Sequence, residues 1–396
     1  MKFLQNAFDK VKPLFEKGGK YEKFYPLYEG HRTIFFAPSL TTGKTGTQIK
    51  DATDLKRVMM TVIIAMIPCL IFGMWNVGHQ HFIATGVEAT LIEKFLLGAE
   101  KVIPIIIVSY AVGLGIEFAF CVARNHPVEE GFLVTGMLIP LVMPASIPLW
   151  QVALATAFAV IIAKEVFGGT GMNILNVALT ARAFLYFAYP SDISGEVWTY
   201  LGDKAPVDGF SGATVLAYGA SAAANDTNMM ADMAGHWYEG MFTFQNMFMG
   251  AIPGSIGETS TLMVLIGAVV LIGTGVGSWK IILSVFGGAW LMGLVFNMVG
   301  VNSFMQMPAH YHLVAGGLAF GAVFMATDPV SASQTETGKW IYGFLIGVLT
   351  VIIRVVNPAY PEGIMLAILF MNVFAPLIDY YVVDANKKRR LKRATV

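Results

Sequence analysis

Residues 102–123, VIPIIIVSYAVGLGIEFAFCVA, decide the fold class of this chain. The run has Glu117 as its charged residue, and it is long enough to cross the hydrocarbon core of a bilayer, which is about 30 Å thick. The rest of the chain is similar, because 56% of its 396 residues are hydrophobic and only 13% are charged. Since soluble domains carry roughly 25% charged residues, this composition is typical of a polytopic membrane protein.

Composition also argues against several classes of function. The formal net charge is zero, so no nucleic-acid partner is expected. The two cysteines, Cys69 and Cys121, lie in separate apolar runs, which argues against a disulfide framework, a zinc site or an iron–sulfur cluster built by this chain alone. Residues 1–20 lack the apolar core of a signal peptide, so the first membrane span is expected to direct insertion.

We predict an all-α polytopic membrane protein with about ten transmembrane helices. Several spans are short and carry Gly or Pro, such as GFLVTGMLIPLVMP at residues 131–144. Such spans are tolerated only where neighbouring protein or a ligand satisfies the freed backbone groups. The expected spans are residues 57–76, 102–123, 131–146, 149–166, 173–189, 260–277, 280–299, 311–327, 339–354 and 363–383.

Basic residues set the expected orientation. Lys56 and Arg57 precede the first span, and six basic residues lie between Lys387 and Arg393, after the last one. Because basic residues favour the cytoplasmic side, both termini are predicted to be cytoplasmic. The loop at residues 190–258 then lies outside, in agreement with its single Lys or Arg, Lys204.

Weak internal similarity indicates two inverted five-helix repeats. Leu133-Val-Thr-Gly136 matches Leu313-Val-Ala-Gly316. Five spans per half require halves of opposite topology, and inverted repeats commonly place a binding site near the midplane, at their interface. The predicted divisions are a cytoplasmic segment at 1–55, the first repeat at 56–189, the external loop at 190–258, the second repeat at 259–384 and a basic cytoplasmic tail at 385–396.

The external loop contains the sequence DGFSGAT at residues 208–214. Gly209 and Gly212 allow backbone conformations that other residues avoid, and the small residues before Thr214 leave its hydroxyl exposed. An exposed threonine hydroxyl near Asp208 is a candidate acceptor for an enzyme that attaches a group to it. An ordinary turn is the alternative, because Gly, Ser and Asp favour turns in general.

Five carboxylates lie in or beside the expected spans. An ionisable group at membrane depth is costly, so it usually faces the protein interior and marks an ion path. Carboxylate oxygens also suit hard cations. Solvation or capping is the alternative for two of them near interfaces, and helix termination is the alternative for the one that precedes a proline. The interfacial pair is Glu29 and Glu258, the acid before proline is Asp328, and the others are Glu117 and Asp379.

Long stretches of the chain resemble the B subunit of the Na⁺-translocating NADH:quinone oxidoreductase. DGFSGAT is similar to the acceptor motif of a flavin transferase that links FMN to threonine through a phosphoester bond. The related D subunit of the Rnf ferredoxin:NAD⁺ oxidoreductase is one alternative, but the long N-terminal segment and NPAYPEG favour the former. A flavin-free channel or transporter is the other alternative. The stretches that carry the resemblance are GGKYEKFYPLYE (18–29), AKEVFGGTGMNILNVALTARAFLYFAYP (163–190), IPGSIGETSTL (252–262), FMATDPVSAS (324–333) and IIRVVNPAYPEGIMLAILFMNVFAPLID (352–379).

The resemblance implies a bacterial inner-membrane protein that works with other subunits and transfers electrons to ubiquinone. FMN would be joined to Thr214 outside the cytoplasm, and a riboflavin would be held non-covalently within the membrane. Asp208, Ser211, Gly212 and Ala213 would complete the acceptor motif. The five carboxylates would contribute to a Na⁺ path, and no other metal is expected. No acid–base dyad is evident, so no catalytic residue is assigned. The GGTG sequence at residues 168–171 does not match the G-x-G-x-x-G fingerprint of dinucleotide binding, so NADH is expected to bind another subunit.

Two further sets of residues are candidates for cofactor contacts. Glycines at the end of a span let a backbone approach a flavin or quinone closely, and an arginine inside an apolar span requires a partner. Helix packing and an interfacial lysine are the alternatives. The flavin candidates are Gly168, Gly169, Gly171, Asn173 and Arg182, and the quinone candidates are Gly113 and Gly115.

Overall fold

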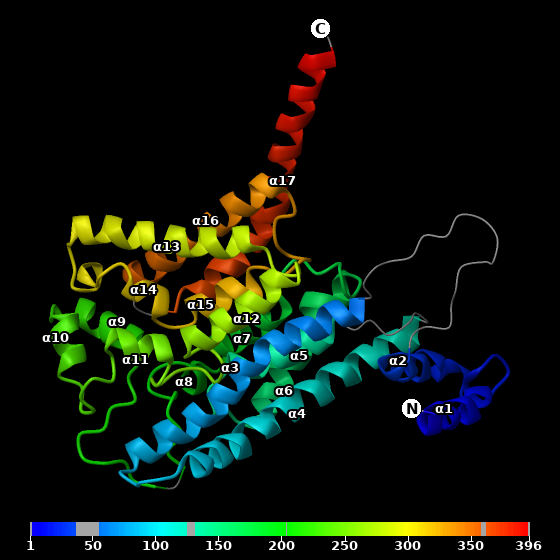
Figure 1. Ribbon diagram of the computed structural model, residues 1–396, viewed down its shortest axis with the longest axis horizontal. Coiled ribbons are helices and arrows are strands. Elements are labelled where there is room, and N and C mark those ends of the chain that lie inside the picture. Colours follow the sequence, from blue (N-terminus) through cyan, green and yellow to red (C-terminus); the bar gives the residue numbers. More distant parts are fainter. Residues whose placement is uncertain (1, 37–54, 125–130, 203, 358–361, 395–396) are drawn as a thin grey trace.

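Helices make up the regular structure of the chain (Figure 1). The computed structural model describes residues 2–36, 55–124, 131–202, 204–357 and 362–394, and no strand forms within these ranges. The all-helical fold class predicted from the sequence is therefore confirmed.

Within these described ranges, six helical units are long and apolar enough to cross a membrane. They coincide with six of the ten predicted spans, and the three longest continue well beyond the apolar run that predicted them. The six are α3 (Leu55–Ala84), α4 (Leu91–Arg124), the unit formed by α6 (Leu149–Phe158), η2 (Ala159–Lys164) and η3 (Glu165–Phe167), α13 (Trp279–Val299), α16 (Glu336–Val356) and α17 (Ile364–Ala394).

The other four predicted spans form shorter helices. At 1.5 Å per residue, a helix of ten residues covers roughly 15 Å, which is half of a hydrocarbon core. Neighbouring protein satisfies the backbone where one of these helices ends, since Gly257 N donates to Leu141 O at 2.7 Å. The shorter helices are α5 (Phe132–Leu141), α7 (Val177–Ala188), α12 (Thr261–Gly273) and the broken unit α14 (Tyr311–Val314), α15 (Leu318–Phe320) and η5 (Gly321–Met325).

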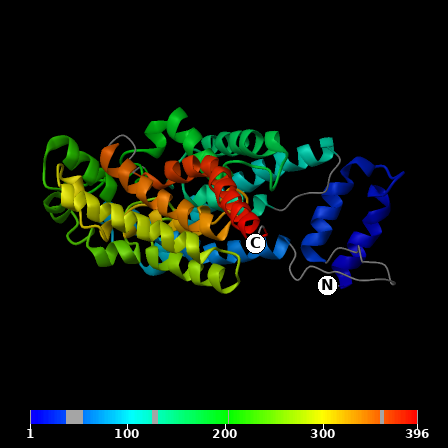
Figure 2. The same cartoon turned by 90° about the horizontal axis from the view of Figure 1, so that it is seen from above.

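The segment before α3 contains helices that lie to one side of the bundle (Figure 2). They are α1 (Lys2–Phe15), η1 (Glu22–Phe24) and α2 (Tyr25–Phe35). The apolar residues Phe3, Leu4, Phe8 and Val11 recur at helical spacing along α1. The ring of His31 lies 5.9 Å from that of Phe118, centroid to centroid, so α2 packs on α4 beside Glu117.

The loop expected outside the membrane is folded rather than irregular. It lies at the C-terminal end of α3, where Val207 N donates to Ala84 O at 2.9 Å. Its helices are α8 (Pro190–Ile193), α9 (Val215–Asn225), α10 (Met229–Ala234) and α11 (Phe244–Met249), and η4 (Phe304–Gln306) packs near α9 from a later connection.

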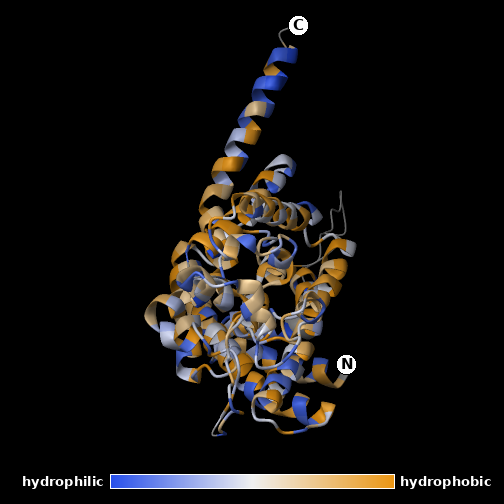
Figure 3. Ribbon diagram, turned by 90° about the vertical axis from the view of Figure 1, so that its left-hand side faces the viewer, coloured by the Kyte–Doolittle hydropathy of each residue, from blue (hydrophilic) through white to orange (hydrophobic). Residues whose placement is uncertain are grey.

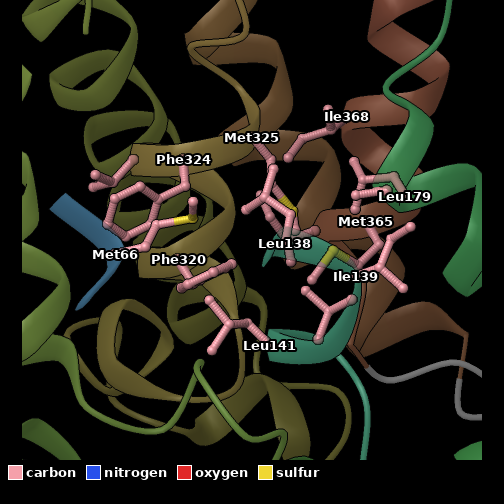
Figure 4. Packing of buried hydrophobic residues seen from close by; sticks show 14 of the residues in the cluster. Met66, Leu138, Ile139, Leu141, Leu179, Phe320, Phe324, Met325, Met365 and Ile368 are labelled. Carbon is pink, nitrogen blue, oxygen red and sulfur yellow. The ribbon is translucent and has the colours of Figure 1, made fainter. Parts of the chain in front are cut away.

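The centre of the bundle is an apolar core to which both halves of the sequence contribute. Leu138 and Leu141 of α5 lie with Phe320 and Phe324 of the broken unit, and all four belong to one buried cluster (Figure 4). Close packing of this kind excludes water from the middle of the bundle. The last turns of α17 extend away from this core and become hydrophilic (Figure 3), as the basic residues of the predicted tail require.

Candidate functional site

A pocket, here called the outer pocket, lies where the loop at residues 190–258 meets α7. It lies toward the C-terminal end of α3, because Asn76 in that half donates to Ile252 O at 2.9 Å and Ile252 lines the pocket. Residues far apart in the sequence therefore meet there. The lining includes Arg182, Trp198, Thr214, Ser255, Glu258 and Glu362.

Thr214 lines this pocket as the N-cap residue of α9. Its hydroxyl oxygen accepts a hydrogen bond from Ala217 N at 3.3 Å. The N-terminus of a helix presents unpaired N–H groups and the positive end of the helix dipole, so it favours negative charge. A phosphate ester on the Thr214 oxygen would thus begin where the helix stabilises an anion.

A carboxylate that the sequence did not reveal holds the turn before Thr214. The hydroxyl of Ser211 and the N–H of Gly212 both donate to the Glu196 carboxylate, at 3.2 and 3.3 Å. A Cβ at position 212 would lie 2.8 Å from Glu196 O, so this approach requires glycine. Gly209 has φ +77°, whereas Asp208 is simply exposed. No local motif signals Glu196, which lies well before the turn in the chain.

Aromatic residues also hold the turn before Thr214 in place. The indole N–H of Trp237 donates to Ser211 O at 3.0 Å, and its ring meets that of Phe210 edge-on at 5.4 Å. His236 packs among the neighbouring rings, and burial lowers the pKa of its imidazole. The turn is therefore fixed from both sides, and DGFSGAT is more than a mobile loop tip.

Arg182 forms a buried ion pair with Glu258 in the outer pocket. Its Nη1 lies 2.9 Å from Glu258 Oε2, and the two side chains are 4% and 3% exposed. The guanidinium also lies 5.6 Å from the Trp198 ring and 3.4 Å from Ser255 Oγ. This pair explains an arginine in an apolar helix. The solvated alternative for Glu258 is wrong, because α7 and the segment before α12 enclose it.

A second buried arginine braces the wall of the outer pocket. Arg354 is fully buried, and its three guanidinium nitrogens donate to Glu362 O, His312 O and Ala315 O at 2.8–3.0 Å. The Glu362 carboxylate accepts from Gly317 N at 2.7 Å. Arg354 and Glu362 therefore fix the irregular backbone between α14 and α15.

A second pocket, here called the interior pocket, lies toward the N-terminal end of α3. Val58 and Met59 of that end line it, so it and the outer pocket lie on opposite sides of the apolar core. Its walls combine apolar groups with amides and hydroxyls. The lining includes Thr135, Lys164, Asn173, Asn176, Phe324 and Asp328.

Glu117 is paired with Lys164 beside the interior pocket. Both side chains are 3% exposed, and Lys164 Nζ donates to Glu117 Oε1. A second pair follows on the same two elements, where Arg124 Nη1 lies 3.1 Å from Glu165 Oε2. The predicted glycines close the helix after this pair with positive φ values of 124°, 99° and 88°, at Gly168, Gly169 and Gly171.

The other predicted acids do not converge with Glu117. Asp379 accepts four hydrogen bonds of 2.6–2.9 Å from Ser333, Gln334 and Thr335, which join α17 to the start of α16. Asp328 accepts from Val330 N and Ser331 Oγ, as the helix-termination alternative predicts, and it also lines the interior pocket. Glu29 lies half-buried in α2.

The two quinone candidates have different surroundings. A Cβ on Gly113 would lie 1.8 Å from the Phe132 ring, so this glycine serves the close packing of α4 on α5. Gly115 is exposed, with open space around it. Within the described ranges, no group of three His, Cys, Asp or Glu side chains is placed to hold a metal ion, and both cysteines are buried thiols.

Comparisons with known proteins show the family of the chain. Residues 42–388 match the model of the NQR2, RnfD, RnfE family. The chain is 50% identical to the B subunit of the Na(+)-translocating NADH-quinone reductase of Chromohalobacter salexigens, over 98% of this chain and 96% of that protein. It is 49% identical to the protein of that name from Ectopseudomonas mendocina, over 97% and 98% of the two chains. Because the match spans nearly the whole sequence, the chain belongs to the NQR2, RnfD, RnfE family.

Proposed function

We propose that this chain is the membrane-embedded B subunit of a Na⁺-translocating NADH:ubiquinone oxidoreductase and carries FMN on Thr214. Full-length relatives bear the name of that subunit. The observation that carries the FMN assignment is the position of Thr214, which begins α9 and lines a pocket that also contains a buried arginine. The other subunits of the complex, a flavin transferase and ubiquinone are the partners that this function requires.

The outer pocket fits a phosphate-bearing flavin. The N-terminus of α9 supplies positive potential beside Thr214, and Trp198 supplies an aromatic wall, while the charge of Arg182 is shared with its partner Glu258. The carboxylates of Glu196, Glu258 and Glu362 oppose an added negative charge, but each already accepts hydrogen bonds from the protein. When bound, FMN would supply electron transfer, while the protein residues orient it and exclude water.

The interior pocket fits the non-covalent riboflavin. The side-chain amides of Asn173 and Asn176 and the hydroxyl of Thr135 suit a neutral polar ligand, and Phe324 offers a ring to pack against its ring system. Placing the two flavins on opposite sides of the apolar core agrees with an electron carrier that works across a membrane. Ubiquinone would approach α4 at Gly115, where the helix surface is open.

We infer that the predicted topology applies to this fold. Each of the ten predicted spans has a helical counterpart, and the central short helix of the first half, α5, corresponds to the broken unit of the second. This supports inverted halves at 56–189 and 259–384, with the loop at 190–258 outside the bacterial inner membrane. The segment at 1–55 and the tail at 385–396 would then be cytoplasmic.

The five predicted carboxylates are proposed to contribute to Na⁺ translocation in different ways. Glu117 and Glu258 are buried, and each has one carboxylate oxygen without a hydrogen-bond partner in the described part of the chain. They are the strongest candidates for direct Na⁺ contact. Asp379 is engaged by the backbone before α16, so it would act by holding that loop in place, and Asp328 and Glu29 would act near the cytoplasmic entrance.

Replacing Glu196 should slow the attachment of flavin to Thr214. In Glu196→Ala the turn loses two hydrogen bonds, worth about 1 kcal/mol each, so we expect attachment to slow about five-fold or more. The measurement is the time course of the ratio of modified to unmodified peptide in purified protein incubated with transferase and flavin donor. Glu239→Ala, an exposed acid of the same loop, is the control. Equal rates for both variants would remove Glu196 from the role of holding the acceptor turn.

The proposed function is tested by restoring membranes that lack this chain. With the chain added back, NADH should drive ubiquinone reduction that Na⁺ stimulates, and sodium should accumulate in inverted vesicles. If reduced ferredoxin, rather than NADH, drives sodium accumulation in these vesicles, the result would support the Rnf alternative instead. A chain that conducts Na⁺ without any redox substrate would support the channel alternative and contradict the proposal.

A further inference from the structure

We propose that Lys164 is a tethered cation that competes with Na⁺ for Glu117, and that it leaves Glu117 when negative charge appears in the interior pocket. This inference rests on the proposed function, because it concerns how that function is regulated at one of its sites. It assigns Lys164 as a positioning residue.

The first observation is that Lys164 belongs to two sites. Its ammonium group pairs with Glu117, and the same side chain lines the interior pocket. The ammonium nitrogen of Lys164 also lies over the Phe132 ring, 6.0 Å from its centroid. A long flexible side chain with a compact charge is suited to moving between two partners a few ångströms apart. Lys164 thus connects the pocket to the carboxylate without any backbone movement.

The second observation is the incomplete pairing of Glu117. Its Oε2 is buried and has no hydrogen-bond partner within the described ranges. Leaving such an oxygen unsatisfied costs roughly 1–3 kcal/mol, more when the group is charged. A carboxylate built only to hold a lysine would have its second oxygen satisfied as well. Carboxylate oxygens are ligands for a hard cation, so Oε2 marks the place from which Na⁺ would bind.

The local backbone also distinguishes Lys164 from a fixed structural residue. It ends the π-helix η2 (Ala159–Lys164), and insertions of this kind in α-helices occur frequently at functional sites. The next residue, Glu165, is anchored because Arg124 donates both to its carboxylate and to its backbone oxygen, at 3.1 and 2.7 Å. The main chain is therefore held while the Lys164 side chain remains the movable part.

The pair in the outer pocket provides a contrast. Glu258 also leaves one oxygen unpartnered within the described residues, but Arg182 is held by Glu258, Ser255 and the Trp198 ring together. A planar guanidinium with several partners is less free to exchange than an ammonium. We therefore assign the exchangeable cation to Lys164 alone. A neutral ring that becomes negatively charged on reduction, such as a flavin, is the ligand class that would draw Lys164 toward the pocket.

The test compares Na⁺ binding by purified complexes that carry Lys164→Met or Lys164→Arg. In Lys164→Met the competitor is absent, so the concentration of radiolabelled Na⁺ that half-saturates the oxidised complex should fall about tenfold, equivalent to ~1.4 kcal/mol. In Lys164→Arg the carboxylate is held by a two-pronged partner, so this concentration should rise. Adding Glu117→Gln to Lys164→Met should abolish the gain in affinity. An Na⁺ affinity that is the same in all variants, or that falls in Lys164→Met, would overturn the proposal.

A second readout uses the non-covalent flavin. Loss of the lysine charge should make the midpoint potential of that flavin more negative in Lys164→Met, with normal flavin content. The shift should be smaller in Lys164→Arg, which keeps a positive charge beside the pocket. If Lys164→Met fails to assemble, Lys164→Arg decides alone, since an unchanged Na⁺ affinity in that variant contradicts competition. A wild-type complex without non-covalent flavin would end the proposed function of the interior pocket, whereas the shift in Na⁺ affinity would still stand.

Discussion

Thr214→Val is expected to abolish covalent flavin in this protein completely. Valine preserves the branched shape of threonine but removes the oxygen to which the phosphate would be joined. The protein should still fold, because the change removes one helix-capping hydrogen bond, from Ala217 N, worth about 1 kcal/mol. The measurement is flavin fluorescence of the protein band after denaturing electrophoresis, normalised to the amount of protein.

The chain offers a closely matched control for this prediction. Thr243 caps α11 in the same loop and accepts from Asn246 N, as Thr214 accepts from Ala217 N. Thr243→Val should therefore retain the full fluorescence. Thr214→Ser, which keeps a hydroxyl at the same place, should retain part of it. A fluorescent band in Thr214→Val would show that the flavin is attached elsewhere.

Arg354→Met is expected to cause the largest loss of stability among single changes near the outer pocket. Methionine has a similar length, but it leaves three carbonyl oxygens, two buried and one part-buried, without these donors. Each unsatisfied buried polar group costs roughly 1–3 kcal/mol, so a loss of about 3 kcal/mol or more is expected. For a chain of this size the midpoint of thermal unfolding should fall by about 5 °C or more.

The measurement is thermal unfolding of the purified, detergent-solubilised complex. The unfolding midpoint of Arg354→Lys should lie between those of the wild type and Arg354→Met, because one ammonium cannot reach three divergent acceptors. Arg389→Met, in the exposed basic tail, should leave the midpoint unchanged. If Arg354→Met unfolds at the temperature of the wild type, the guanidinium does not hold the backbone between α14 and α15.

The sequence alone was sufficient for the helical class and for six helices of membrane-spanning length in the described part of the chain, whereas the other four predicted spans form shorter or broken helices. Each run such as 102–123 is self-sufficient in backbone hydrogen bonds as a helix, so hydropathy locates it. The glycines after Lys164 were proposed for close approach to a cofactor, and their three positive φ values in close succession give a further reason for glycine, because this conformation is strained for other residues. Helix lengths were harder to predict from the sequence, because α4 begins at Leu91 among charged residues that hydropathy assigns to a loop.

The partners of the candidate residues were not accessible from the sequence. Glu117 was identified as an intramembrane acid, but its pairing with Lys164 depends on how η2 packs against α4. Glu258 was placed near an interface and is instead buried against Arg182. Glu196 had no signal, because a single acid before a distant turn has no spacing that marks it. Long-range contacts of this kind arise from the packing of short helices, which no local pattern encodes.

The most direct test of the central claim is mass spectrometry of the peptide that spans DGFSGAT, residues 208–214, from protein purified from its native membrane. The account predicts a mass increase equal to FMN attached with loss of water, with fragment ions that place the added group on Thr214. It also predicts that the corresponding Thr214→Val peptide is unmodified. An unmodified wild-type peptide in a complex that reduces ubiquinone with NADH, or fragments that place the flavin on Ser211, would contradict it.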